Sequence, residues 1–334
     1  MSDTRFDVLG IGNAIVDVLA KTNEAFLIQE GLTKGSMRLI DEAEAERLYA
    51  NMGPASEVSG GCAGNTVSGV ASFGGRAAFI GRVKDDTLGK VFRHDINAFG
   101  VTYSTPPAPN GLATARSMIL ITPDGERTMN TFLGASTELT PAEIDADLIA
   151  ASAITYLEGY LWDPPHAKDA FLKAAEIAHG AGRKVALTLS DSFCVDRFRD
   201  EFLKLIEDKT IDIVFANEAE AHALAQTADY ETAQSFLKER TELAVITRGE
   251  NGAEAMRNGE YALAPASKVN DIQDLTGAGD LFAAGFLYGL AKGYDLKVCL
   301  TLGNIAAAEV IAHVGARPQT SLKNLAEQAG LKLS

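Results

Sequence analysis

The feature that most constrains the fold is an alternation of two hydrophobic patterns along the second half of the chain. Apolar runs of strand length recur at 154–157, 185–189, 211–216 and 243–247, and longer amphipathic segments such as 167–179 lie between them. Short apolar runs indicate buried strands, whereas apolar residues three and four positions apart indicate helices. Because the two patterns alternate, the sequence predicts an α/β fold with a mostly parallel sheet and helices on both of its faces.

The first half of the chain predicts further β-structure. Two apolar runs, at 115–122 and 127–132, are joined by a turn at Asp124-Gly125. This arrangement is typical of a β-hairpin. We also expect strands at 6–12, 15–21 and 77–80 and a helix at 62–73.

Composition and charge argue against several classes of partner. Of the 334 residues, 46% are hydrophobic and 22% are charged, which is typical of a globular chain with a substantial core. The net charge of -15 disfavours nucleic acid, because binding to a phosphate backbone depends on clustered Lys and Arg. Cys62, Cys194 and Cys299 fit no disulfide framework, and the longest apolar helical run is too short to span a bilayer. We therefore expect a cytoplasmic protein that binds a small molecule and neither nucleic acid nor a membrane.

The segment 274–280 has the sequence Asp-Leu-Thr-Gly-Ala-Gly-Asp and precedes an apolar run, 281–292, with helical spacing. Glycines at a helix start let the backbone approach an anion, and the first N–H groups of the helix favour negative charge. Asp280 could take the proton of a substrate hydroxyl, which is the acid–base step that phosphoryl transfer needs. Taken alone, a first-turn carboxylate is explained as readily by its interaction with the helix dipole.

Ligands of open α/β sheets bind beyond the carboxyl ends of the strands, so polar residues at strand ends are candidates. Asn217 and Glu220 follow one strand, and their spacing suits either a helix cap or magnesium-bound water. Thr247, with Gly249 and Gly252, suits either a nucleotide or a simple hairpin turn. Further strand-end or helix-start positions are Asn13, Asp17, Gly60, Gly61, Asn65 and Asp191, of which the first five could bind vicinal hydroxyls or could simply be polar loop residues.

Two competing nucleotide motifs are absent from the sequence. Gly10-Ile11-Gly12 is followed by Ile15 where the dinucleotide fingerprint requires glycine. The chain also lacks a Gly-x-x-x-x-Gly-Lys-Ser/Thr segment, which disfavours a P-loop kinase.

In their order along the chain, these segments resemble the PfkB, or ribokinase, family of carbohydrate and nucleoside kinases. The resemblance implies a ribokinase-like three-layer α/β/α sandwich with a mostly parallel central sheet and a small β-sheet lid over the acceptor. The large part would comprise residues 1–13, 53–100 and 134–334, and the lid would comprise 14–52 and 101–133. ATP and Mg²⁺ are the implied cofactors, with a monovalent cation as a further candidate, and the chain would act as a monomer or a homodimer.

The resemblance also implies roles for individual residues. Asp280 would be the catalytic base, the backbone of Gly277, Ala278 and Gly279 would form an anion hole, and Arg127 would neutralise charge on the phosphate. Asn217 and Glu220 would organise Mg²⁺, partly through water. Asn13, Asp17, Gly60, Gly61 and Asn65 would surround the acceptor, and Thr247, Gly249, Gly252 and Asn304 would bind the nucleotide.

Within the family, the resemblance is to members that phosphorylate the 5′-hydroxyl of adenosine. An apolar pocket for the purine would then be formed by Met37, Leu133, Tyr160 and Leu161. The sequence departs from the family pattern at Leu275 and at Cys62-Ala63, which bears on the acceptor more than on the reaction. Two alternatives stay open: a kinase of a free sugar such as ribose or fructose, and a non-catalytic protein that senses a nucleoside or sugar.

Overall fold

Within the residues that the structure describes, the larger of two sheets has nine strands in the order β14-β13-β12-β11-β10-β9-β1-β5-β6. The computed structural model describes residues 4–257 and 259–333. The strands run parallel except at one edge, where β13 is antiparallel to both of its neighbours. Their bounds are β1 Phe6–Ile11, β5 Ala77–Ile80, β6 Val101–Tyr103, β9 Ser152–Glu158, β10 Lys184–Thr188, β11 Ile213–Asn217, β12 Leu243–Thr247, β13 Ala253–Arg257 and β14 Glu260–Ala264.

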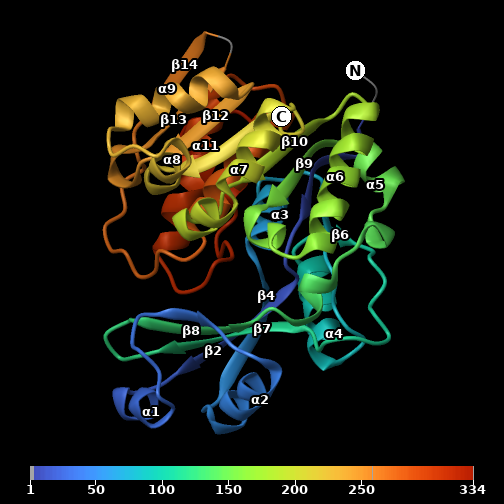
Figure 1. The fold of residues 1–334 in the computed structure, drawn as a ribbon. Helices are drawn as coiled ribbons and strands as arrows, with labels where there is room; N and C mark the ends of the chain where they lie inside the picture. The colour runs from blue at the N-terminus through green and yellow to red at the C-terminus, as the bar shows by residue number, and fades with distance from the viewer. Residues whose placement is uncertain (1–3, 258, 334) are drawn as a thin grey trace.

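Helices cover both faces of this sheet, so the expected three-layer α/β/α sandwich is confirmed (Figure 1). Successive strand residues point to opposite faces, and β1 illustrates this because Val8 and Leu9 belong to different hydrophobic cores. One core packs beneath α3 Cys62–Ser72, α4 Thr87–Ala98, α10 Ala278–Ala291, α11 Leu296–Ile311 and α12 Leu322–Gln328. The other packs beneath α5 Ala146–Ala150, α6 Pro165–Gly180, α7 Ser192–Glu207, α8 Glu218–Ala225 and α9 Tyr230–Arg240.

The second sheet has five strands in the order β3-β8-β7-β2-β4. It lies below the larger sheet in Figure 1, with two helices on its far side, and a small core of its own includes Leu27, Leu48 and Met118. The hairpin expected between 115 and 132 is present as β7 and β8. The bounds are β2 Ile15–Lys21, β3 Met37–Leu39, β4 Ala55–Gly60, β7 Ala115–Ile121, β8 Arg127–Phe132, α1 Glu24–Gln29 and α2 Glu42–Asn51.

Two strands lie on the other side of the boundary that we expected between the large part and the lid. The sequence predicts residues 55–60 in the large part, but β4 pairs with β2 from Ile15↔Gly60 to Ala20↔Ala55. It predicts residues 101–103 in the lid, but β6 pairs with β5 of the large sheet. The polar sequence of β4 and the three-residue length of β6 carry little local signal, so only their backbone pairing reveals where they belong.

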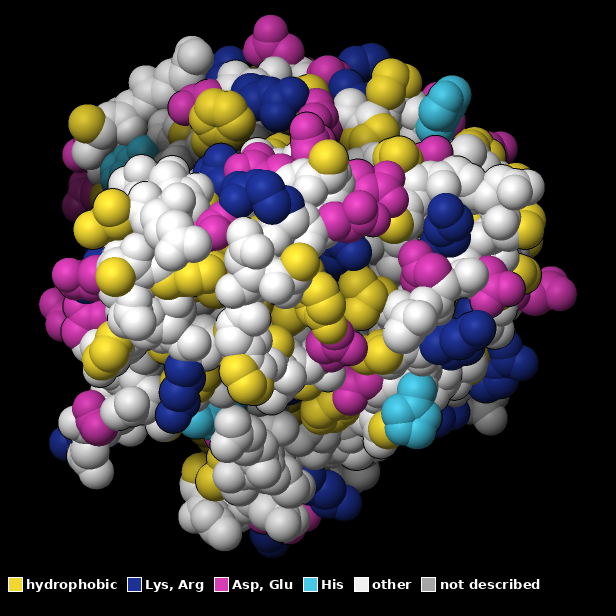
Figure 2. All heavy atoms as spheres, turned by 90° about the horizontal axis from the view of Figure 1, so that it is seen from below, with side chains coloured by type: hydrophobic (Ala, Val, Ile, Leu, Met, Phe, Trp, Pro, Cys, Tyr) yellow, Lys and Arg dark blue, Asp and Glu magenta, His cyan; other side chains and the backbone are white. Residues whose placement is uncertain are grey.

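The helix after the Asp274–Asp280 segment begins earlier and is more deeply buried than its spacing predicts. α10 starts at Ala278, which places Asp280 in its first turn, and every residue from Leu281 to Gly289 is buried. Burial on all sides follows from packing of α10 against α3, α11 and the sheet. Among the helices of residues 4–257 and 259–333, none carries an apolar stretch of the length that spans a bilayer. On the face seen in Figure 2, acidic and basic side chains are interspersed.

Candidate active site

A cavity of about 790 Å³ is lined by residues of both sheets. The small sheet contributes residues of β2, β3, β7 and β8, and the large sheet contributes positions at the carboxyl ends of β9, β10, β11 and β12. The helix starts of α3 and α10 complete the wall. The volume falls in the range of small-molecule sites, about 300–1,000 Å³.

The turn that leads into α10, residues 277–280, lines the cavity with Gly277, Ala278, Gly279 and Asp280. Gly277 has a φ of 80°, and a Cβ there would lie 2.8 Å from the Cβ of Ala316, so the turn requires glycine. Among the described residues, no side chain caps the first N–H groups of α10. This helix start can therefore stabilise an anion in the cavity.

Asp280 faces the cavity and is otherwise enclosed by the protein. Burial raises its pKa from 3.8 to about 6, although hydrogen bonds from Asn65 and Cys62 and the charge of Arg317 act in the opposite direction. The Asn65 amide nitrogen donates to the Asp280 carboxylate over 2.9 Å. Above a pH of about 6, Asp280 is thus an ionised carboxylate that can accept a proton.

The cavity end formed by β1, β2 and α3 contains Asn13, Asp17, Gly61 and Asn65. A side chain at Gly60 would collide with the Asp17 carboxylate, and one at Gly61 with the backbone oxygen of Asn13. The glycine pair therefore lets α3 begin close to these polar groups. Burial raises the pKa of Asp17 to about 7.

Glu158, at the end of β9, is a buried carboxylate that the motif search did not single out. It accepts hydrogen bonds from the side-chain amide of Asn13 at 2.7 Å and from the backbone N–H of Ala63 at 2.9 Å. It thereby joins the end of β1 to the start of α3. Burial raises its pKa to about 7. Its position at a strand end was the signal in the sequence that could have indicated it.

The wall contributed mainly by the small sheet has an apolar part, and Arg38, Ser117 and Thr131 add polar groups to the same wall. It includes Met37 and Leu133, as expected, and Tyr160 approaches from the large sheet; further members are Leu39, Ile119 and Met129. The expectation that Leu161 lines this pocket is wrong, because Leu161 is 1% exposed and packs in the core of the large part. Neighbouring positions in the turn after β9 point to different sides, which the sequence does not reveal.

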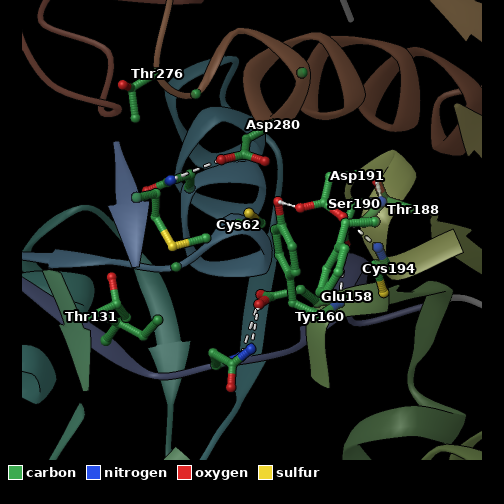
Figure 3. Close-up of a pocket in the computed structure, with 18 of the residues that line it drawn as sticks. Cys62, Thr131, Glu158, Tyr160, Thr188, Ser190, Asp191, Cys194, Thr276 and Asp280 are labelled. Atoms are coloured by element: carbon green, nitrogen blue, oxygen red, sulfur yellow. Dashed lines mark hydrogen bonds between the residues drawn. The ribbon is translucent and has the colours of Figure 1, made fainter. Parts of the chain in front are cut away.

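Tyr160 and Asp191 lie together on the wall formed by β9 and β10. The Tyr160 hydroxyl donates to the Asp191 carboxylate over 2.9 Å, as Figure 3 shows, and Asp191 also caps α7. Ser190, which directly precedes Asp191, has a φ of 73°, a conformation that costs free energy for a residue other than glycine. Its hydroxyl accepts the backbone N–H of Tyr160, which holds this turn in place.

At the other end of the cavity, Asn217 and Glu220 form a capping box at the start of α8. Both oxygens of Glu220 accept hydrogen bonds from Asn217, and burial raises the Glu220 pKa to about 7. In the described chain, no group of three or more His, Cys, Asp or Glu side chains could hold a metal ion. The expected role of the pair in holding water-bound Mg²⁺ stays a prediction.

Of the residues expected to bind nucleotide, Thr247 lines the cavity, whereas Gly249, Gly252 and Asn304 lie outside its lining. Gly252 has a φ of 87° in the turn between β12 and β13. Asn304 donates to the backbone oxygens of Ala264 and Pro265. In the described structure these residues shape the loops beside the cavity.

Arg127, on β8, also lies outside the lining. Its guanidinium forms an ion pair of 2.7 Å with Asp274, and both side chains are nearly buried. Asp274 in turn accepts the backbone N–H groups of Thr276 and Gly315. Arg127 is thus anchored next to the turn at 277–280.

Comparison with known proteins agrees with this geometry. Residues 36–323 match the pfkB family of carbohydrate kinases. The crystal structure of an adenosine kinase from Sinorhizobium meliloti is 53% identical, with a TM-score of 0.90 over 97% of this chain and 99% of that one. A probable sugar kinase protein from Rhizobium etli is also 53% identical, with a TM-score of 0.91 over 98% of this chain and 99% of that one. Adenosine kinase of Saccharomyces cerevisiae is 27% identical over 91% of this chain and 94% of its own length.

A ribokinase-like α/β fold, a small second sheet and an acidic helix start that opens into their shared cavity define a sugar or nucleoside kinase of the ribokinase type. The chain belongs to the PfkB family of carbohydrate kinases.

Proposed function

We propose that this protein transfers the γ-phosphoryl group of ATP to the 5′-hydroxyl of adenosine, a reaction of purine salvage. The observation that carries the proposal is a single cavity with two kinds of polar group in its lining. Asn13 and Asp17 could bind an acceptor at one end, and Asn217, at the start of α8, could face the phosphates at the other. Asp280 lines the same cavity and is hydrogen-bonded to Asn65.

In the proposed reaction, Asp280 accepts the proton of the acceptor hydroxyl as the new oxygen–phosphorus bond forms and the bond from the γ-phosphorus to the β,γ-bridging oxygen of ATP breaks, which releases ADP. The N–H groups of 277–280 stabilise the negative charge of the phosphoryl group. Bound Mg²⁺ would neutralise phosphate charge, and Asn217 with Glu220 would hold its water ligands. Arg127 would add positive charge after exchanging its partner, Asp274, for phosphate oxygens.

Adenosine is the proposed acceptor because part of the wall from the small sheet is apolar. Met37, Ile119 and Leu133 can pack against a purine, and Tyr160 adds an aromatic ring. The 53% identity to the Sinorhizobium meliloti adenosine kinase supports the same acceptor.

A free sugar is the second candidate. Asp17, Glu158 and Asn13 concentrate polar groups at one end of the cavity, which suits a polyhydroxylated ligand. The 53% identity to the probable sugar kinase protein of Rhizobium etli supports this alternative.

A panel of acceptors separates these functions. The purified chain is given ATP, Mg²⁺ and, in turn, adenosine, other nucleosides, ribose and fructose, and ADP release is measured. The proposal expects adenosine to give the highest kcat/KM. A higher kcat/KM for ribose or fructose would overturn the choice of acceptor, and saturable binding without ADP release would indicate a sensor.

A further inference from the structure

Arg317 is a buried arginine, 8% exposed, in the segment that follows α11. It reaches the corner at which β4 passes into α3. Its Nε donates to the backbone oxygen of Ser59 and its Nη2 to the Ser59 hydroxyl, both over 2.9 Å. Its Nη1 donates to the backbone oxygen of Gly64 and to the Ser68 hydroxyl. The guanidinium is thus hydrogen-bonded to α3, the helix that carries Asn65.

The two residues before Arg317 contact the segment that ends at Asp280. The backbone N–H of Gly315 donates to Asp274 over 3.0 Å. Ala316 packs against Gly277, where a Cβ would come within 2.8 Å of the Ala316 Cβ. Three consecutive residues therefore connect the 274–280 segment to the start of α3.

Arg317 interacts with nearby carboxylates by charge alone, without hydrogen bonds to them. Its four hydrogen bonds go to neutral backbone and hydroxyl oxygens. Asp17, Asp95 and Asp280 are the carboxylates that its charge affects. Burial lowers the pKa of Arg317 to about 10, so the side chain still carries its charge at neutral pH. A buried charge is costly to retain, which makes its position beside these carboxylates informative.

We propose that Arg317 is a positioning residue of the phosphoryl transfer, which holds Asn65 beside Asp280 and supplies a buried positive charge that favours the ionised carboxylate. The inference rests on the proposed function of Asp280 as the base. It adds a residue outside the cavity lining to the groups that govern the reaction.

Several groups face Asp280 from the elements packed around it. Asp17 on β2, Glu158 on β9 and the buried Tyr156 on β9 lie within electrostatic reach of Asp280, whose charge raises the pKa of each of them. On α3, Cys62 and Asn65 favour ionisation of Asp280 by hydrogen bonding, and Arg317 does so by charge. Removing the arginine charge leaves only the hydrogen bonds to offset the burial of the Asp280 carboxylate.

The test compares pH profiles of kcat/KM for wild type, Arg317→Gln and Arg317→Lys, from about pH 5 to about pH 9, with the best acceptor of the panel. Arg317→Gln is expected to move the acidic midpoint upward by about one pH unit and to lower activity about tenfold below that midpoint, with recovery at high pH. Arg317→Lys keeps the charge and loses part of the hydrogen bonding. Its midpoint should stay at the wild-type value while its activity falls evenly at every pH.

A purely structural role predicts an even loss of activity across pH for Arg317→Gln, with no shift of the midpoint, and that result would overturn the proposal. Thermal unfolding establishes which variants are folded. If Arg317→Gln does not fold, Arg317→Met, which also lacks the charge, takes its place, and the same two outcomes of its pH profile decide. Absence of ADP release by the wild type would instead refute the proposed function.

Discussion

The guanidinium of Arg127 lies 2.7 Å from the carboxylate of Asp274, and this buried ion pair joins the small sheet to the segment that leads to Asp280. Arg127 belongs to β8 of the small sheet, whereas Asp274 lies in the segment between β14 and α10, and the two residues depend on each other unequally. Asp274 also accepts two backbone N–H groups, from Thr276 and Gly315. The pair therefore serves both the packing of the small sheet and the shape of the turn at 277–280.

Asp274→Ala should destabilise the fold more than Arg127→Met. The alanine leaves a buried guanidinium and two backbone donors without their acceptor, and removing one partner of a buried pair costs about 3–5 kcal/mol. In Arg127→Met, Asp274 keeps its backbone partners. Urea unfolding of both variants measures the difference, and equal destabilisation would show that the backbone bonds of Asp274 contribute little.

Asp280→Asn is expected to lower kcat by a factor of about 10²–10⁴, with little change in acceptor affinity. The amide keeps the size of the carboxylate but cannot accept the hydroxyl proton. Turnover and acceptor binding are measured by ADP release and by calorimetry. Near-normal turnover in the folded variant would remove Asp280 from the role of base.

The pH profile of kcat/KM should fall on its acidic side between about 6 and about 7, the raised pKa values of Asp280 and Asp17. Both groups are raised by burial, so protonation occurs at a higher pH than for exposed carboxylates. As pH decreases through this range, the base is protonated and the rate falls. In Asp17→Asn a single acidic midpoint near 6 should remain, and a profile that is flat down to about pH 5 would contradict the assignment.

Glu158→Gln should change how stability depends on pH. The raised pKa of Glu158, about 7, means that its contribution is fully present below its unfolded pKa and is lost as pH rises through about 7. Glutamine has no such dependence. The deficit of the variant relative to wild type should therefore shrink by about 1–3 kcal/mol between about pH 4.5 and about pH 8.

Urea unfolding at several pH values measures this change. The same substitution at Glu46, an exposed residue of α2, is the control. A constant deficit for Glu158→Gln would show that the carboxylate titrates as in the unfolded chain.

Met37→Ala should raise the KM for adenosine about tenfold and affect a free sugar less, because the lost contact is with the apolar wall. Ile28→Ala is the matched control. Ile28 is 78% exposed and lies on α1, a helix that packs on the small sheet and does not line the cavity. Steady-state kinetics with adenosine and ribose provide the measurement. An equal effect on both acceptors would indicate that Met37 packs the lid without contacting a base.

The sequence alone was enough to predict the α/β class, most strands of the large sheet and the hairpin of the small one, because hydrophobic period is a local property of the chain. It also indicated Asp280 at a helix start, since the glycines and the apolar run that follows are adjacent to it. It did not predict which sheet β4 and β6 belong to. Their local patterns are weak, and only their backbone pairing with β2 and β5 assigns them to a sheet.

Which distant residues meet at the site depends on how the helices and strands pack together. Asn13 and Glu158 are 145 positions apart, and Arg317 and Ser59 are 258 apart, yet both pairs are hydrogen-bonded. Leu161 and Tyr160 are adjacent, yet one packs in the core and the other lines the cavity. The physical reason is that local spacing specifies helices, strands and turns, whereas burial, charge compensation and strand pairing depend on how those elements pack together.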